Sequence, residues 1–355
     1  MSALPQATDA WPAADLESVP ACPVCAEARR VVWREGVVDA AFRAAPGRWT
    51  LWRCMGCDAA YLDPRPTAAS IGRAYSRYYT HAGEPAKNFL VLGDRPDLWF
   101  KRAMHLSHYA RAYAHHQRGV WPLIGRLIDA SAWRRARAGQ FIRHLPGPQS
   151  EADELLDVGC GDGGFLRVAR ALGYRARGIE FDPQSAQTAQ RQGFDVFIGG
   201  VDTAPLPQVS LAQITLSHVI EHLHDPIAVL RRLHAALRPG GRIWLQTPNI
   251  DSRGAERFGV AWRGLEAPRH LVMFNAASLS SALTRAGFAA AQLLPPQLDA
   301  AFYIEQSTAM AEGRDPYQND RARRRAARRE GKALDRAALT DPAHAESITL
   351  IAFKR

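Results

Sequence analysis

The run LLDVGCGDGG, from Leu155 to Gly164, decides the fold of this 355-residue chain. Its first four residues have the mainly apolar pattern of a buried parallel strand, and an apolar helical face begins at Phe165. Gly159, Gly161 and Gly163 can adopt positive φ and carry no Cβ, so backbone amides at the helix N-terminus can approach a ligand closely. The run therefore predicts a strand, a nucleotide-sized turn and a helix.

A second strand-like segment supports a cofactor at this turn. It runs from Arg175 to Ile179 and ends at Glu180, 21 residues after Gly159. An acidic side chain at this distance can accept hydrogen bonds from both ribose hydroxyls of a nucleotide-like cofactor. A glycine-rich turn alone can also occur for purely structural reasons. The spacing between this turn and Glu180 favours a cofactor site over that interpretation.

Four segments occur in order along the chain: LLDVGCGDGGFL, GIEFDP, TLSHVIEHLHDP and LRPGGRIWLQTPN. Over residues 150–355 they resemble the class I S-adenosylmethionine-dependent methyltransferases. The resemblance implies an α/β, Rossmann-like fold with a seven-stranded sheet, and S-adenosylmethionine as the cofactor. It also argues against a nicotinamide enzyme, because the turn is GxGxG rather than GxGxxG and dehydrogenases lack counterparts of the HxxEH and PGG segments.

The resemblance implies the cofactor contacts as well. The methionine part would lie on Asp157 and the glycine loop, the ribose on Glu180, and the adenine beside the two residues that follow it. The chain departs from the family at residues 211–213, where Leu-Ala-Gln stands in place of the acid that usually begins this strand. The expected cofactor-binding residues are Asp157, Gly159, Cys160, Gly161, Gly163, Glu180, Phe181, Asp182, Ser217 and His218.

Four of the five cysteines form two CxxC pairs, Cys22 with Cys25 and Cys54 with Cys57, separated by 28 residues. This is zinc-ribbon spacing, in which an intervening hairpin brings two pairs of thiolates together around a tetrahedral Zn²⁺. The alternatives are two disulfides or four free thiols, and a reducing compartment disfavours the disulfides. Four thiolates leave no open coordination position, so this metal is expected to hold the fold and to perform no chemistry.

We expect three parts in the chain. Residues 1–66 form a zinc-ribbon-like domain with a loose N-terminal tail, and residues 67–150 form a helical linker or lid. Residues 151–355 form the methyltransferase domain, which ends in an antiparallel hairpin of strands near 289–294 and at 347–353.

The linker contains aromatic and histidine side chains that could be mistaken for a site. Tyr78, Tyr79 and His81 could lie near the active site, as in related bacterial proteins, but core packing is the favoured interpretation. Four further histidines have a spacing that invites a metal cluster, yet no carboxylates accompany them. We therefore interpret them as packing or solvated residues: His105, His108, His115 and His116.

The segment from His218 to His222 reads HxxEH, the signature of inverted zincin proteases. Here it follows a strand at 214–217, and Pro226 interrupts soon afterwards, whereas a zincin carries the motif within a long helix. The methyltransferase resemblance places the segment beside the methionine end of the cofactor. Glu221 and His222 are expected to begin the next helix, and His222 is kept as a catalytic candidate with a structural alternative.

The loop from Trp262 to Leu271 combines aromatic, acidic, cationic and imidazole groups, which suits a pocket for the methyl acceptor. His270 is the leading candidate for a general base, because the ordinary pKa of histidine, about 6.5, is close to working pH. In the alternative interpretation, His270 and Arg269 only pin the loop in place.

Composition and charge set wide bounds. The chain is 47% hydrophobic and carries a formal charge of +10, but no apolar run reaches the length of about 20 residues that a membrane span requires. No basic and apolar leader begins it, so a cytoplasmic location is expected. The positive charge is densest from Arg321 to Arg329, which we interpret as a solvated helix face. Contact with an anionic lipid surface or a phosphorylated substrate is the alternative.

Three functions are compatible with these patterns. The first is methylation of a small-molecule acceptor, such as a sugar, a glycolipid or a secondary metabolite. The second is methylation of ribosomal or transfer RNA. It is less favoured because the second knuckle of this chain is Cys-x-x-Cys, whereas related ribosomal-guanine methyltransferases with an N-terminal zinc module have Cys-x-x-x-His. In addition, no basic groove lined with aromatic side chains is evident. The third is a noncatalytic interaction module. The sequence predicts neither the acceptor atom nor the oligomeric state.

Overall fold

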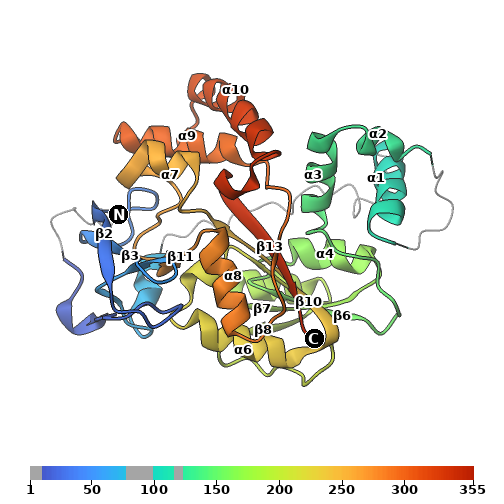
Figure 1. Cartoon of the computed structure of the whole chain (residues 1–355), viewed down its shortest axis with the longest axis horizontal. Coiled ribbons are helices and arrows are strands. Elements are labelled where there is room, and N and C mark those ends of the chain that lie inside the picture. Colours follow the sequence, from blue (N-terminus) through green and yellow to red (C-terminus); the bar gives the residue numbers. More distant parts are fainter. Residues whose placement is uncertain (1–9, 77–98, 116–122) are drawn as a thin grey trace. The chain divides into compact units, whose positions relative to one another are not determined.

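The computed structural model describes residues 10–76, 99–115 and 123–355 (Figure 1). Tyr78, Tyr79, His81 and His116 lie outside the described residues. The described residues divide into two compact units, each treated separately below. The first unit comprises residues 10–76, 218–231 and 245–352, and the second comprises residues 99–115, 123–217, 232–244 and 353–355.

The strands and helices follow one another as labelled in Figure 1. The strands are β1 (Leu16–Glu17), β2 (Arg30–Val37), β3 (Trp49–Cys54), β4 (Ala60–Leu62), β5 (Arg65–Pro66), β6 (Glu154–Val158), β7 (Arg175–Glu180), β8 (Asp195–Ile198), β9 (Leu211–Ser217), β10 (Leu237–Pro248), β11 (Val272–Met273), β12 (Gln292–Leu293) and β13 (Ser347–Phe353). The helices are α1 (Trp99–Ala112), α2 (Arg126–Asp129), α3 (Ala132–Phe141), α4 (Gly164–Ala171), α5 (Pro183–Arg191), α6 (Pro226–Ala236), α7 (Arg253–Phe258), α8 (Ala276–Arg285), α9 (Ala300–Ala311) and α10 (Arg321–Ala338).

The main sheet has seven strands in the order β12-β13-β10-β9-β6-β7-β8, as predicted for a Rossmann-like fold. Strand β6 pairs in parallel with both β7 and β9, and β7 pairs in parallel with β8. Strand β9 is buried along almost its whole length, in keeping with its mainly apolar sequence, LAQITLS. The predicted closing hairpin is confirmed, because β12 and β13 are antiparallel with Gln292 opposite Ile351.

The second unit is held by a core that joins the linker helices to the first β-α unit. It includes Tyr109, Ile128, Ile142, Leu145, Leu155 and Val168. Two of the linker histidines are buried beside this core. His108 Nδ1 lies 2.6 Å from Asp129 Oδ1, and His115 Nε2 lies 2.9 Å from the Leu145 carbonyl oxygen. These contacts fit packing residues.

The first unit contains a second sheet, of four strands in the order β11-β4-β3-β2. Strands β2 and β3 are antiparallel, as the predicted hairpin requires, and β4 pairs antiparallel with β3. The fourth strand, β11, comes from far along the sequence, with Val272 opposite Tyr61. The N-terminal module is therefore completed by the residues that directly follow the loop at 262–271.

One local prediction is wrong. Glu221 and His222 do not begin a helix, because they lie in a separate 3-10 turn from Ile220 to His222, and α6 begins only at Pro226. The backbone of His218 has a φ of +55°, and Leu223 is extended, so the chain cannot continue as one helix. Pro226 suits the first helical position, where a backbone N–H has no helical partner to lose.

Among the described helices, none combines the length and the apolar character needed to cross a bilayer.

Candidate active site and metal centre

The glycine turn after β6 has the backbone geometry of a ligand cradle. Gly159, Gly161 and Gly163 have φ values of +73°, +55° and +84°, a region that favours glycine. A Cβ built on Gly161 would meet nothing within 4 Å, so the space above this residue is open. Gly163 is the N-cap of α4, so the first backbone N–H groups of this helix, which lack a helical partner, adjoin the turn; that of Gly164 donates to Asp162 Oδ1 at 2.9 Å.

Asp157, the last acidic residue of β6, is buried with 1% of its surface exposed. Its Oδ1 accepts a hydrogen bond from Thr215 Oγ1 at 2.7 Å and forms an ion pair with Arg143. The other oxygen, Oδ2, has no hydrogen-bond partner among the described residues. Burial raises the pKa of this carboxyl. An unsatisfied buried carboxylate oxygen beside an open turn fits the ammonium group of S-adenosylmethionine.

Glu180 stands at the C-terminal end of β7 and closes the turn from the other side. Its Oε2 accepts the Gly161 N–H at 2.8 Å, and its Oε1 accepts the Asp182 N–H at 2.9 Å. The Asp182 side chain caps α5 by accepting the Ser185 N–H at 2.7 Å. The Phe181 side chain is 66% exposed, which leaves its ring available to a flat ligand.

Cys160 is buried in the same turn. Its Sγ fills the space that a side chain on Gly178 would need. Burial raises the pKa of its thiol well above the ordinary range, so this cysteine is not an activated nucleophile. Ser217 ends β9, and the chain passes directly to His218, the first residue of the acceptor-side segment in the other unit.

The four N-terminal cysteines come together in the first unit. Their sulfur atoms lie within 4.8 Å of one another, with Cys22 Sγ 3.6 Å from Cys57 Sγ and Cys25 Sγ 3.4 Å from Cys54 Sγ. These separations exceed the S–S bond of about 2.05 Å. They approach the edge of about 3.8 Å that a tetrahedral site with Zn–S bonds of about 2.3 Å would have. The geometry excludes disulfides here and fits a bound metal.

The two knuckles have the same local structure. In each, the residue after the second cysteine, Ala26 or Asp58, has positive φ and donates its N–H to the carbonyl of the first cysteine. Backbone N–H groups two residues beyond Cys22 and Cys54 point at their sulfur atoms, at 3.4 and 3.3 Å. Such donors stabilise thiolates and orient them toward a metal.

Glu221, in the HxxEH segment, is a charged group with no exposed surface. Its Oε2 accepts from Thr247 Oγ1 at 3.0 Å, and its Oε1 lies 3.3 Å from His218 Nδ1. Although burial acts to raise it, the pKa of Glu221 is lowered to about 2 by His218 and neighbouring histidines. Burial likewise acts against the His218 cation, but the contact with Glu221 raises the pKa of His218. The two groups thus form an ion pair.

His222 and His270 lie edge to face, with ring centroids 4.7 Å apart. His270 Nδ1 donates to the Gly264 carbonyl at 2.7 Å. His222 Nδ1 lies 3.0 Å from both the Tyr75 hydroxyl and the Arg269 carbonyl oxygen. Because a carbonyl oxygen only accepts, Nδ1 carries a proton in both rings. Burial lowers the pKa of His270 to about 4, so this ring is neutral at pH 7.

The loop that carries His270 is held by buried ion pairs. Glu266 pairs with Arg263 and, at 3.4 Å, with Arg269. Burial acts to raise the pKa of Glu266, but these cations and His270 lower it far below its usual range. Arg269 also pairs with Asp39 of the N-terminal module, at 2.6 and 3.0 Å. The predicted acceptor loop is therefore rigidly supported.

Asp299 is a buried acidic residue that the sequence pattern does not single out. Its position before α9 suggests only a helix cap, yet its side chain makes no capping hydrogen bond. Its Oδ2 accepts from Ser347 Oγ at 2.7 Å, and its Oδ1 has no hydrogen-bond partner among the described residues. Burial raises the pKa of Asp299 to about 7, while Ser347 and His218 act against that rise.

Glu221, His222 and His270 also place one ligand-type atom each within 4.8 Å of the others. Two imidazoles and a carboxylate can bind a transition metal. Both oxygens of Glu221 already face protein groups, Thr247 and His218. The arrangement therefore suits proton transfer better than metal binding.

Comparison with known proteins agrees with this fold. Residues 130–293 match the family model described as a methyltransferase domain. The chain is 30% identical over 148 residues to a malonyl-[acyl-carrier protein] O-methyltransferase of Serratia marcescens, covering 41% of this chain and 57% of that protein. It is 30% identical over 119 residues to a ubiquinone biosynthesis O-methyltransferase of Xanthomonas oryzae pv. oryzae, covering 32% of this chain and 48% of that protein.

A third relative acts on RNA by name. It is a tRNA U34 carboxymethyltransferase of Desulfotalea psychrophila, 27% identical over 170 residues, which cover 45% of this chain and 52% of that protein. The chain spans about half the length of the curated relatives that it matches. The matched segment contains the glycine turn, Glu180 and the HxxEH segment, so residues 130–293 are similar to a methyltransferase domain.

Proposed function

We propose that the chain transfers a methyl group from S-adenosylmethionine to a small-molecule acceptor of the sugar, glycolipid or secondary-metabolite class. The observation that carries this proposal is the pair His222 and His270, two imidazoles whose Nδ1 atoms are anchored to backbone carbonyls. His270 is buried and His222 is half-buried, which suits an acceptor small enough to be enclosed.

The cofactor would be held by the second unit. Asp157 Oδ2 and the glycine turn would bind its methionine part, and Glu180 its ribose. When bound, the cofactor supplies a methyl group on a positively charged sulfur. What the protein must add is alignment of the acceptor and removal of its proton.

His270 would take that proton at Nε2. Its hydrogen bond to Gly264 fixes the ring, and its low pKa keeps Nε2 free of a proton at pH 7. His222, with its edge toward the same ring, would orient the acceptor or pass the proton on. Ser217, the last residue of β9, is followed directly in the sequence by His218.

The four cysteines would hold one structural Zn²⁺. Four protein thiolates complete a tetrahedral shell, so this ion would stabilise the N-terminal module without touching the acceptor. The module supports the acceptor loop through Asp39, which gives the metal an indirect role in activity.

The test uses purified protein, a labelled methyl donor and fractionated extract of the source organism. Label in a low-mass or lipid-linked fraction supports the proposal, whereas label in RNA would contradict it. RNA is the second candidate because one relative is named for a tRNA substrate and because α10 is strongly basic. The variant His270→Ala should abolish labelling in whichever fraction carries it.

A further inference from the structure

Helix α10 has one face that nothing in the described structure covers. The helix contains eight cationic and two acidic side chains. Six of the cations are exposed and make no ion pair or hydrogen bond with any described residue. They are Arg321, Arg325, Arg328, Arg329, Lys332 and Arg336.

The spacing of these six side chains places them on one stripe, the basic stripe. At 100° per residue they fall within an arc of about 100° around the helix axis, and at a rise of about 1.5 Å per residue they extend over about 22 Å. The exposed residues beside the stripe are small, namely Ala322, Ala326 and Ala333. A flat partner could therefore approach the helix closely along its whole length.

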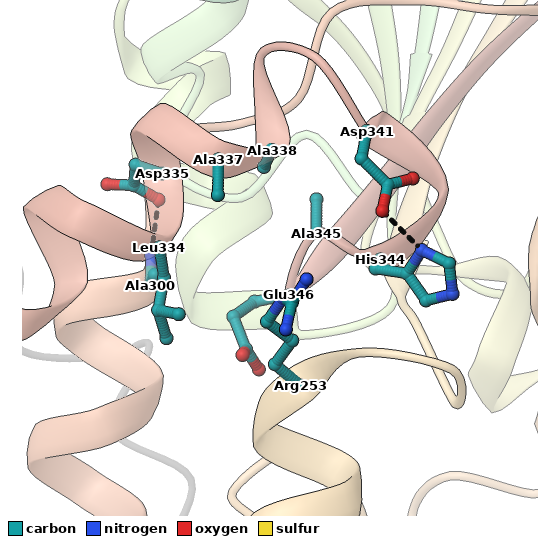
Figure 2. A pocket seen from close by; sticks show the side chains of 10 residues that line it. All are labelled: Arg253, Ala300, Leu334, Asp335, Ala337, Ala338, Asp341, His344, Ala345 and Glu346. Carbon is teal, nitrogen blue, oxygen red and sulfur yellow. Dashed lines mark hydrogen bonds and ion pairs between the residues drawn. The ribbon is translucent and has the colours of Figure 1, made fainter.

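The opposite face of α10 is fully used. Ala327 and Gly331 are buried, and a side chain on Gly331 would collide with Ala301 of α9. Farther along, the helix lines a small pocket with Glu346 and Arg253, where Asp335 Oδ1 accepts the Ala300 N–H at 3.1 Å (Figure 2). Packing thus fixes the rotation of α10, so the basic stripe faces outward because of the fold.

We propose that the basic stripe of α10 binds the phosphate backbone of a nucleic acid. Duplex nucleic acid of the B form carries one negative charge per about 1.7 Å of axis with both strands counted, so a length of about 22 Å holds roughly a dozen phosphates, and those on the facing side are available to the stripe. Five of the six side chains are arginines, whose guanidinium groups can each bind phosphate with two parallel hydrogen bonds.

The residues around the basic stripe also indicate which kind of anionic partner it binds. An interfacial membrane helix needs exposed Trp, Phe or Leu beside its cations, and the exposed neighbours of this stripe are alanines. Single-strand binding relies on bases stacking on aromatic side chains, and α10 has none. Recognition should therefore be independent of sequence and should work on a duplex.

The experiment measures binding of the full chain to a fluorescent 24-base-pair RNA duplex by anisotropy between 50 and 300 mM KCl. We expect log K to fall linearly with log salt, with a slope that changes by about 0.9 for each phosphate contact. The variant Arg325→Gln/Arg328→Gln/Arg329→Gln should lose at least about tenfold in affinity at 100 mM salt and reduce the slope by about 2.7. An unchanged slope in this variant would overturn the proposal.

Two controls separate charge from structure. The variant Arg134→Gln/Arg137→Gln/Arg191→Gln removes three exposed arginines of the other unit and should bind like the wild type. The variant Arg325→Lys/Arg328→Lys/Arg329→Lys keeps the charge and should keep most of the slope. If the control loses as much affinity as the stripe variant, binding is diffuse and the stripe is not a site.

Two further arms identify the partner. A DNA duplex of the same length should bind with a similar slope. Binding to vesicles with 30% phosphatidylserine but not to either duplex would assign the stripe to lipid and overturn the proposal. A labelled methyl donor in the RNA samples separates the two proposals, because label in RNA would refute the small-molecule acceptor while leaving the phosphate site intact.

Discussion

Arg269 and Asp39 stand 230 residues apart in the chain and form a two-point ion pair with no more than 1% of either side chain exposed. The Arg269 guanidinium also donates to the Ala74 carbonyl at 2.9 Å and lies over the Phe42 ring. Two segments of the first unit, the N-terminal module and the acceptor loop, are thus locked by one residue next to the proposed base.

The first prediction concerns this pair. Asp39→Asn removes the closer counter-ion of the buried Arg269 and leaves only Glu266, at 3.4 Å, and breaking a buried pair typically costs about 3–5 kcal/mol. We expect the free energy of unfolding, measured with urea, to fall by that amount. Glu312→Gln, which removes one of the two acidic partners of the exposed Arg314, is the control and should leave the midpoint unchanged. Equal stability of Asp39→Asn and wild type would show that the pair does not hold the loop.

The second prediction concerns the cofactor turn. Gly161→Val places a branched side chain at a φ of +55°, and Glu180→Ala removes the carboxylate at the end of β7. Both variants should abolish S-adenosylmethionine binding in calorimetry. Gly193→Val is a matched control, since Gly193 also has positive φ and open space but lies outside the turn. It should bind the cofactor normally, and tight binding by Gly161→Val would exclude this turn as the cofactor site.

The third prediction distinguishes the two interpretations of His270. Asn at this position can still donate to the Gly264 carbonyl, as Nδ1 does now, but it offers no Nε2 base. If His270 is the base, both His270→Asn and His270→Ala should lower kcat by about 10²–10⁴-fold, with cofactor affinity unchanged. Near wild-type turnover in His270→Asn would instead assign His270 a purely structural role.

The fourth prediction is a pH dependence of stability. The pKa of folded His270 is about 4, below the ordinary 6.5, so the unfolded chain binds this proton more readily. Its neutral form therefore contributes fully above pH 6.5, and the contribution is lost as pH falls toward 4. Relative to His270→Asn, the wild type should lose about 3 kcal/mol over that interval. A difference between the two proteins that stays constant with pH would mean that His270 is not desolvated.

The fifth prediction concerns the metal. Purified protein should contain one zinc ion per chain by mass spectrometry, and Cys54→Ser should lose it. Cys160→Ser, which removes the one cysteine outside the cluster, should retain the metal. Because β3 ends at Cys54 and pairs with β4, metal loss should also lower the melting temperature of the protein. Full zinc content in Cys54→Ser would refute the proposed ligand set.

Much of the fold follows from local pattern. The predicted strands at 175–180 and 347–353 coincide with β7 and β13, because each is a short strand-like segment and β13 is almost wholly apolar. The cysteine pairs meet as their spacing predicts. The failure at Glu221 and His222 has a local cause that the pattern does not reveal, since His218 adopts a left-handed conformation that only tertiary contacts can hold.

The acceptor side was less predictable for a different reason. Asp39 sits in an ordinary-looking turn sequence, and Asp299 resembles a helix cap, so neither carries a local signature. Asp39 pairs with Arg269, 230 residues away, and Asp299 accepts a hydrogen bond from Ser347, 48 residues away. Pairings of this kind depend on how the chain folds back, and a single sequence does not encode them in any periodicity.

The strand β11 also sets an order of events during synthesis. About 210 residues separate it from β4, its partner, and at a synthesis rate of about 5–20 residues per second they take roughly 10–40 s to appear. Until then the outer edge of β4 has no strand to pair with, and bare edges invite pairing between chains. The four-stranded sheet therefore begins to leave the ribosome early and is completed late. Slower translation of the downstream residues would lengthen the time for which the edge of β4 is open to other nascent chains.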